Sequence, residues 1–233
     1  MRIPHLAFAL IAGASLSAQT NPAAGKLLIA ERHLLDPNFS RTVVLLLDHD
    51  EESSLGLVVN RPTSFAAARL LPQVEALAER GERIFIGGPV GAEQVWVLSR
   101  GEAPDGVEVV PGVWFTTSAA ALDQLAASAD TEFRVFGGYA GWGAGQLAGE
   151  IERGDWRVLP ATEALIFSPN PERLWQQLYE KTSIRFAHGP AWDSGGKWIP
   201  STSKLKSWSM AAPDWAASKA APSWSPSRFL ASD

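Results

Sequence analysis

A glycine-rich stretch at residues 136–147 comes nearest in this sequence to a ligand-binding motif. It reads Phe-Gly-Gly-Tyr-Ala-Gly-Trp-Gly-Ala-Gly-Gln-Leu, and glycines before a helix can hold a phosphate group through backbone N–H groups. The dinucleotide fingerprint would need a glycine where Gln146 stands, and no Gly-Lys-Ser/Thr follows as in a P-loop. We therefore interpret the stretch as a corner at which elements pack closely, in preference to a phosphate-binding site.

The acidic run at residues 48–52 is a second candidate site. It reads Asp-His-Asp-Glu-Glu, and carboxylates beside a histidine suit divalent metal ions. The run lacks the alternating acids and the glycine of a calcium loop, and no second histidine follows at helical spacing. We favour a solvated turn between two strands, and we expect no metal site and no cofactor.

Catalytic chemistry has few candidates in this chain. The sequence contains no cysteine, which excludes thiol nucleophiles, disulfides and cysteine metal sites. No Gly-x-Ser-x-Gly elbow is present. A buried Glu150 could act as a general base, but pairing with Arg153 or Arg157 is the simpler interpretation. A hydrolase-like enzyme acting at the glycine corner is the alternative to a non-enzymatic protein.

The elements around the corner can be predicted from hydrophobic periodicity. Residues 131–136 alternate and are rich in β-branched and aromatic types, which predicts a strand that ends at the glycine pair beginning with Gly137. A helix follows from about residue 143 and should end at Gly154. Trp142 and Trp156 bracket this helix, and each indole can be buried if its N–H finds an acceptor.

Other segments predict a mixture of strands and helices. The apolar run 42–47 indicates a strand buried on both faces, and residues 55–59 indicate the next strand. Residues 65–80 have a helical composition that Pro72 should kink or split. Residues 119–128 predict a further helix.

Length and net charge indicate the number of domains and the classes of partner. The chain has 233 residues and a formal net charge of −5, and it shows no basic stripe. This pattern disfavours nucleic-acid binding. We expect one domain over residues 25–188, with an unidentified protein or small molecule as its partner.

The two ends of the sequence differ from this domain. Residues 1–24 predict a signal peptide cleaved after Ala18, or else an extension without regular structure. Their apolar run is too short to span a bilayer, so we expect no transmembrane segment. Residues 189–233 are rich in Ser, Pro, Ala, Gly and Trp and predict a disordered tail. Its Trp and Lys residues could contact a membrane interface or a polymer, although a tail without specific function is the simpler interpretation.

Four motifs in a fixed order resemble the YqgE/AlgH family of bacterial proteins. They lie at residues 36–45, 55–62, 87–90 and 138–156. The resemblance implies a compact α+β domain in which a mixed or antiparallel sheet is folded towards a pseudo-barrel with flanking helices. Family members are labelled transcriptional regulators, but no catalytic residue or cofactor comes with the resemblance.

The chain departs from the family pattern in three places. Ala148 stands where the family has an acidic residue, the leader precedes the first strand, and the Trp-rich tail follows the domain. Export to the periplasm, which we predict from residues 1–18, would exclude a role in transcription. Cytoplasmic location, as is usual for the family, is the alternative.

Polar and glycine residues of the motifs form the candidate surface for a ligand or partner. We expect a non-enzymatic binding or regulatory module that uses loops, where binding groups are concentrated. For Asn60 and Arg61, side-chain hydrogen bonds that hold a corner are an equally good interpretation. The candidate residues are Asn38, Asn60, Arg61, Gly87, Gly88, Pro89, Gly141, Trp142, Gln146 and Glu150.

Overall fold

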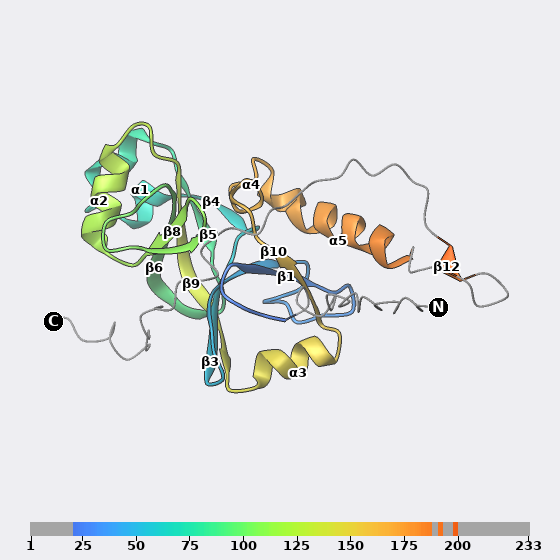
Figure 1. Ribbon diagram of the computed structural model, residues 1–233. Coiled ribbons are helices and arrows are strands. Elements are labelled where there is room, and N and C mark those ends of the chain that lie inside the picture. The colour runs from blue at the N-terminus through green and yellow to red at the C-terminus, as the bar shows by residue number, and fades with distance from the viewer. Residues whose placement is uncertain (1–20, 188–190, 193–197, 200–233) are drawn as a thin grey trace, which may run out of the picture. The chain divides into compact units, whose positions relative to one another are not determined.

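A ten-stranded sheet forms the body of the protein in the computed structural model, which describes residues 21–187, 191–192 and 198–199 (Figure 1). Its strands are β1 (Lys26–Ala30), β2 (Val43–His49), β3 (Ser53–Val58), β4 (Pro62–Ala66), β5 (Arg83–Ile86), β6 (Val90–Arg100), β7 (Val107–Val110), β8 (Val113–Thr116), β9 (Phe133–Gly143) and β10 (Trp156–Pro160). The main path runs β10-β1-β2-β3-β9-β6-β8-β7, and β5 joins β4 to β9.

The sheet is mixed but predominantly antiparallel. The pairing of β5 with β9 is parallel, whereas the other pairings within this sheet are antiparallel. The sheet curls into a half-barrel with helices outside it, which confirms the predicted α+β class. The apolar run of β2 is buried from Val43 to Leu47, as its continuous hydrophobic pattern predicts.

Strand β9 connects the two halves of the sheet. Its first half pairs with β5 and β6, and its second half pairs with β3. The predicted end of this strand at the glycine pair is therefore wrong, because β9 continues through Gly137 and Gly138 to Gly143. The glycines instead permit a close crossing: a Cβ added at Gly88 would lie 2.2 Å from the carbonyl carbon of Tyr139.

Helices lie around the curled sheet. They are α1 (Ala67–Leu70), the 3-10 helix η2 (Glu75–Glu79), α2 (Ala119–Ala127), α3 (Gln146–Glu152), α4 (Glu163–Ile166) and α5 (Pro171–Ala187). Figure 1 shows α1 and α2 together near β6 and β8, with α3 at the opposite end, beyond β3. Leu77, Leu122, Leu125 and Phe133 belong to the apolar cluster beneath α1, η2 and α2.

Two predicted helices have outcomes that local chemistry explains. The helix predicted over residues 65–80 is split into α1 and η2 around Pro72, and Phe65 belongs to β4 instead. Proline removes a helical N–H and restricts the residue before it. Helix α2 begins as predicted, because the Ser118 side chain accepts a hydrogen bond from the N–H of Ala121.

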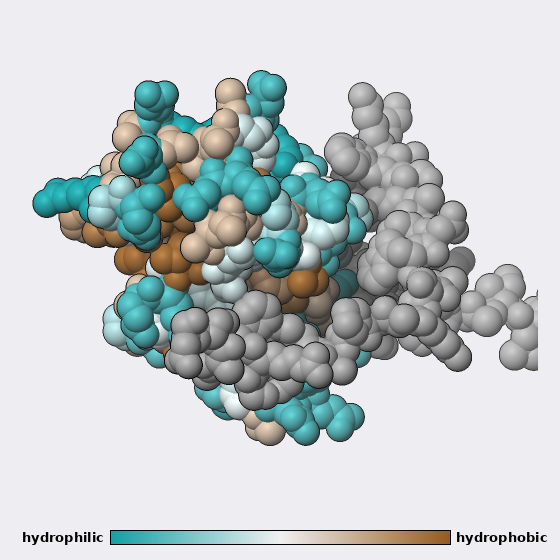
Figure 2. Space-filling view, turned by 90° about the vertical axis from the view of Figure 1, so that its left-hand side faces the viewer, coloured by the Kyte–Doolittle hydropathy of each residue, from teal (hydrophilic) through white to brown (hydrophobic). Residues whose placement is uncertain are grey.

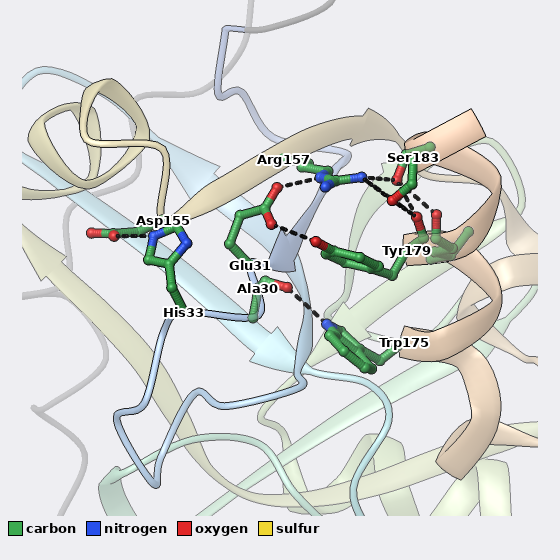
Figure 3. A network of polar contacts seen from close by, with 10 residues as sticks. Ala30, Glu31, His33, Asp155, Arg157, Trp175, Tyr179 and Ser183 are labelled. Carbon is green, nitrogen blue, oxygen red and sulfur yellow. Dashed lines mark hydrogen bonds and ion pairs between the residues drawn. The ribbon is translucent and has the colours of Figure 1, made fainter. Parts of the chain in front are cut away.

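Helix α5 is attached to β1 and β10 by polar contacts (Figure 3). The Trp175 Nε1 donates to the carbonyl of Ala30 at 2.8 Å, and the Tyr179 hydroxyl donates to Glu31 Oε2 at 2.9 Å. Arg157 of β10 pairs with the same carboxylate and donates to the Thr182 hydroxyl at 2.8 Å.

The electrostatics of this attachment affect Glu31. Burial would raise its pKa, but hydrogen bonds from Arg157 and Tyr179, together with the Arg157 charge, outweigh burial and hold the pKa below its ordinary value. The carboxylate therefore stays ionised at neutral pH and contributes to holding α5 against the sheet.

A second unit comprises residues 188–233. Its described residues form one short antiparallel pair, β11 (Ala191–Trp192) with β12 (Trp198–Ile199), where the sequence predicts a tail without regular structure. The signal peptide predicted from residues 1–18, and the tail apart from these two strands, lie outside the described residues. Within the described part of the chain, no helix is long and apolar enough to cross a membrane.

Candidate functional site

Glu150 joins three elements at the glycine corner. Its Oε2 accepts hydrogen bonds from the indole nitrogens of Trp142 on β9 and Trp156 on β10, each at 2.9 Å. Its Oε1 accepts from the Gln146 side chain at 3.0 Å. Both indoles are buried, so the expectation that the N–H groups of these two tryptophans find an acceptor is confirmed.

The arginines that the sequence assigns to Glu150 have other partners. Arg153 pairs with Asp155 at 2.9 Å, and Arg157 pairs with Glu31 across the sheet. The predicted pairing with Glu150 is therefore wrong. Successive residues of a strand point to opposite faces, so Trp156 reaches Glu150 while Arg157 reaches α5.

An aromatic group packs beside the Glu150 carboxylate. Phe39 stacks on Trp142 with ring centroids 5.8 Å apart, and it meets the edge of Trp156 at 5.6 Å. The two indoles lie edge to face at 6.2 Å. Phe39 thereby attaches the loop that precedes β2 to the corner formed by β9, α3 and β10.

Asn60 and Arg61 also hold this loop. The Asn60 Oδ1 accepts from the N–H of Val43 at 2.7 Å, and its Nδ2 donates to the Arg41 carbonyl at 3.0 Å. The Arg61 guanidinium donates to three carbonyls, those of Pro37, Asn38 and Ser40. These contacts agree with the interpretation in which the side chains of Asn60 and Arg61 hold a corner through hydrogen bonds.

The other candidate residues lie at the strand crossing and on the loop surface. A Cβ added at Gly87 would lie 2.2 Å from the Gly138 carbonyl oxygen, so backbone packs tightly there. Pro89 and Gly141 are exposed. Asn38 is also exposed, and its N–H donates to Asp36 Oδ1 at 2.7 Å.

A hollow of about 500 Å3 lies beside the corner, and we call it the corner hollow. The turn between β2 and β3 forms one wall, and the end of β9 with the beginning of α3 forms the other. The lining residues are His49, Asp50, Glu51, Ser54, Gly143, Gly145, Leu147 and Ala148. The fold therefore brings together the acidic run and the glycine-rich stretch, which are separate candidates in the sequence.

His49 and Ser54 form a polar pair in this hollow. The His49 Nδ1 lies 2.7 Å from the Ser54 Oγ, and the two residues are opposite each other in the β2–β3 register. Ser54 is only 6% exposed. The sequence contained the signal for this pair, since a hairpin whose turn is centred on residues 51 and 52 places position 49 opposite position 54.

Asp50 organises the turn of that hairpin. Its Oδ1 accepts from the N–H groups of Glu52 and Ser53, both at 2.8 Å, as aspartate commonly does in turns. In the described part of the chain, no group of three or more His, Asp or Glu residues could hold a metal ion.

Sequence comparison identifies the family. The family model described as AlgH-like matches residues 27–187. The chain belongs to the AlgH-like family. A UPF0301 protein of Streptomyces avermitilis is 42% identical over 164 residues, which cover 67% of this chain and 85% of that protein. Another, from Chlorobaculum tepidum, is 40% identical over 158 residues, with 66% and 83% covered.

Solved structures share the AlgH-like fold. The solution structure of the AlgH protein from Pseudomonas aeruginosa matches with a TM-score of 0.58 at 31% identity, covering 72% of this chain and 95% of that one. The crystal structure of protein DIP2367 from Corynebacterium diphtheriae matches with a TM-score of 0.61 at 24% identity, covering 74% and 94%. The α+β fold with a curled sheet, predicted for this AlgH-like chain as a sheet folded towards a pseudo-barrel, is thus shared with both proteins.

Proposed function

We propose that this AlgH-like chain is a binding module whose ligand occupies the corner hollow. The observation that carries the proposal is the position of this hollow against the corner that the motifs build. Gln146 and Glu150 hydrogen-bond within the corner, and Asn60 and Arg61 hold the adjoining loop. The polar atoms of these side chains hydrogen-bond within the protein and hold the surrounding backbone in place. A preformed small-molecule site requires such rigid surroundings.

The lining of the hollow restricts the ligand class. Asp50 and Glu51 place carboxylates on one wall, whereas Leu147 and Ala148 provide apolar atoms on the other. Like charges repel at short range, and the chain as a whole carries a net charge of −5. The ligand we propose is a small molecule that has an apolar part and no net negative charge.

Any regulatory role would then act through this ligand or through a protein partner. A DNA contact needs a basic surface to neutralise phosphates, and the carboxylates of Asp50 and Glu51 have the opposite charge. The regulator label of the family is compatible with a ligand-sensing protein that does not itself bind DNA.

A blocking substitution tests the proposal. Ala148 is exposed on α3 and lines the hollow, so Ala148→Trp fills the space. Ala120→Trp adds the same side chain to an exposed alanine of α2 and is the matched control. Choline serves as a cationic probe and acetate as an anionic one, and binding is followed by backbone amide NMR shifts.

The proposal predicts that choline shifts amide signals of the hollow in the wild type and in Ala120→Trp. In Ala148→Trp the apparent affinity should fall at least about tenfold, a change of about 1.4 kcal/mol. Acetate should bind more weakly than choline. Equal choline affinity in Ala148→Trp and in the wild type would place the site elsewhere.

A further inference from the structure

We propose that the corner hollow contains a reactive serine, Ser54, with His49 as its base. This inference rests on the proposed function, because the same hollow must admit the substrate. It extends that function from binding to acyl transfer. The two side chains are the only Ser–His pair joined by a hydrogen bond in the described part of the chain.

The geometry suits proton transfer from the hydroxyl. A nucleophile and its base must lie within about 2.6–3.2 Å, and the Ser54 Oγ is 2.7 Å from the His49 Nδ1. In the tautomer that carries its proton on Nε2, the Nδ1 accepts the hydroxyl proton. Both residues lie on paired strands, so the distance is fixed by the sheet rather than by a mobile loop.

The pair is a dyad and not a triad. Among the described residues, no carboxylate hydrogen-bonds to the His49 ring, whose polar contact is the one with Ser54. A third group normally orients the base and stabilises the imidazolium. We therefore expect slow turnover, and a covalent probe is a more sensitive readout than product formation.

The reaction is hydrolysis of a small ester. The Ser54 Oγ adds to the ester carbonyl carbon as the His49 Nδ1 takes the hydroxyl proton. The bond to the alcohol oxygen then breaks, and the alcohol leaves with the proton from His49. Water adds to the acyl-serine with His49 again as base, and the Ser54 oxygen leaves with its proton restored. The products are one carboxylic acid and one alcohol.

The surroundings of the pair select the substrate class. Leu147 and Ala148 offer an apolar wall for a short acyl chain, while Asp50 and Glu51 disfavour an anionic group. A hollow of about 500 Å3 limits the size of the substrate. The preferred substrates are short-chain esters that are neutral or carry a cationic alcohol.

A small neutral dialkyl fluorophosphate tests the inference on the full chain. The Ser54 oxygen would form a bond to phosphorus, fluoride would leave, and the hydroxyl proton would pass to His49. Intact mass spectrometry should show one adduct per chain, and peptide mapping should place it on Ser54. Ser54→Ala should give no adduct, whereas Ser53→Ala, next to it on β3, should label like the wild type.

The base is tested by the labelling rate. His49→Gln should label at least about tenfold more slowly, in line with the contribution of a general base. A wild-type chain without an adduct on Ser54, or a folded His49→Gln variant labelled at the wild-type rate, overturns the inference. Peptide mapping of the wild type decides the point even where a variant does not fold.

The two proposals fail in distinguishable ways. If the wild type gives no adduct but binds choline, and Ala148→Trp weakens that binding, the reactive serine is refuted and the binding module stands. Absence of both labelling and binding would show that the hollow is not a site.

Discussion

Glu150 shows how a motif residue that resembles a catalytic base can have an architectural role. Its two oxygens accept three hydrogen bonds, from Trp142, Gln146 and Trp156. The carboxylate thereby joins β9, α3 and β10, and no proton transfer is needed to explain its presence. Acid–base chemistry at this position would require breaking contacts that hold the corner.

Removing this carboxylate should destabilise the fold. Glu150→Ala leaves the indole N–H groups of Trp142 and Trp156 buried without an acceptor, and each such group costs about 1–3 kcal/mol. We expect a loss of about 2–4 kcal/mol in the free energy of unfolding, measured by urea titration with circular dichroism. Glu152→Ala, at an exposed position of the same helix, should change it by less than about 0.5 kcal/mol. Similar losses in the two variants would contradict the architectural role.

At this scale the sequence predicted the type of contact better than the partners. That Trp142 and Trp156 need acceptors follows from the chemistry of indole, and the acceptor lies on the helix between them. The partners of Glu150 were missed because Arg153 is close in sequence. The alternation of side chains along β10 decides which residues face α3, and that requires the register of the sheet.

Strand β9 shows that local sequence patterns also fail to predict where a whole element ends when tertiary packing decides it. The sequence predicts its first half correctly, but a glycine pair inside it looks like a strand end. In the structure Gly87 and Gly88 pack against the backbone of Gly138 and Tyr139. A close crossing of two backbones requires glycine in the middle of an element, and local propensity cannot distinguish it from a terminus.

Substitutions at two glycines distinguish a glycine required by close backbone packing from one that only lowers helix propensity. In Gly88→Ala the new Cβ would lie 2.2 Å from the Tyr139 carbonyl carbon, so we expect overpacking to cost about 1–3 kcal/mol or more. In Gly149→Ala the nearest atom is the end of the Arg153 side chain at 3.6 Å, and alanine should stabilise α3 by up to about 1 kcal/mol. Thermal unfolding of both variants measures these opposite shifts. A neutral Gly88→Ala would contradict the close crossing.

The attachment of α5 should depend on pH through Glu31. Its pKa is lower in the folded chain than in the unfolded chain, so its contribution is complete above the unfolded pKa. The contribution is lost as pH falls through the folded value. The melting temperature of Glu31→Gln should therefore lie below that of the wild type at pH 7, and this difference should shrink below about pH 4.

Glu180→Gln provides the control for this measurement. Glu180 is exposed on α5, and its hydrogen-bond donor among the described residues is Gln176 of the same helix. Its substitution should give a small difference in melting temperature that changes little with pH. A difference for Glu31→Gln that grows as pH falls would contradict the direction of the pKa shift.

For the whole molecule, the sequence could predict the fold class but not the hollow. The α+β class follows from the order of strands and helices and from the resemblance to the family. The hollow arises because the β2–β3 hairpin pairs with the end of β9, which brings residues 48–52 next to α3. No local pattern specifies that pairing, although the hairpin itself places His49 opposite Ser54.

The surface also has an apolar region (Figure 2). Figure 2 shows hydrophobic side chains gathered in a depression on one face, bordered by hydrophilic ones. Scattered apolar residues are common on protein surfaces, and larger contiguous patches mark interaction sites. The large hydrophobic residues exposed in the described part of the chain are Leu35, Phe65, Leu70, Ile86, Val90 and Val107.

A fragment screen by backbone amide NMR is the decisive measurement for the assignment of the corner hollow as the ligand site, because it compares all surfaces of the protein at once. Small neutral, cationic and anionic compounds are added in turn to the full chain, and shifted amide signals are mapped onto the structure. We expect neutral and cationic fragments to shift signals around Ser54, Gly143, Gly145 and Ala148, and anionic fragments not to shift them. Shifts confined to exposed apolar residues such as Phe65, or to no single surface, would contradict the assignment of the corner hollow as the ligand site.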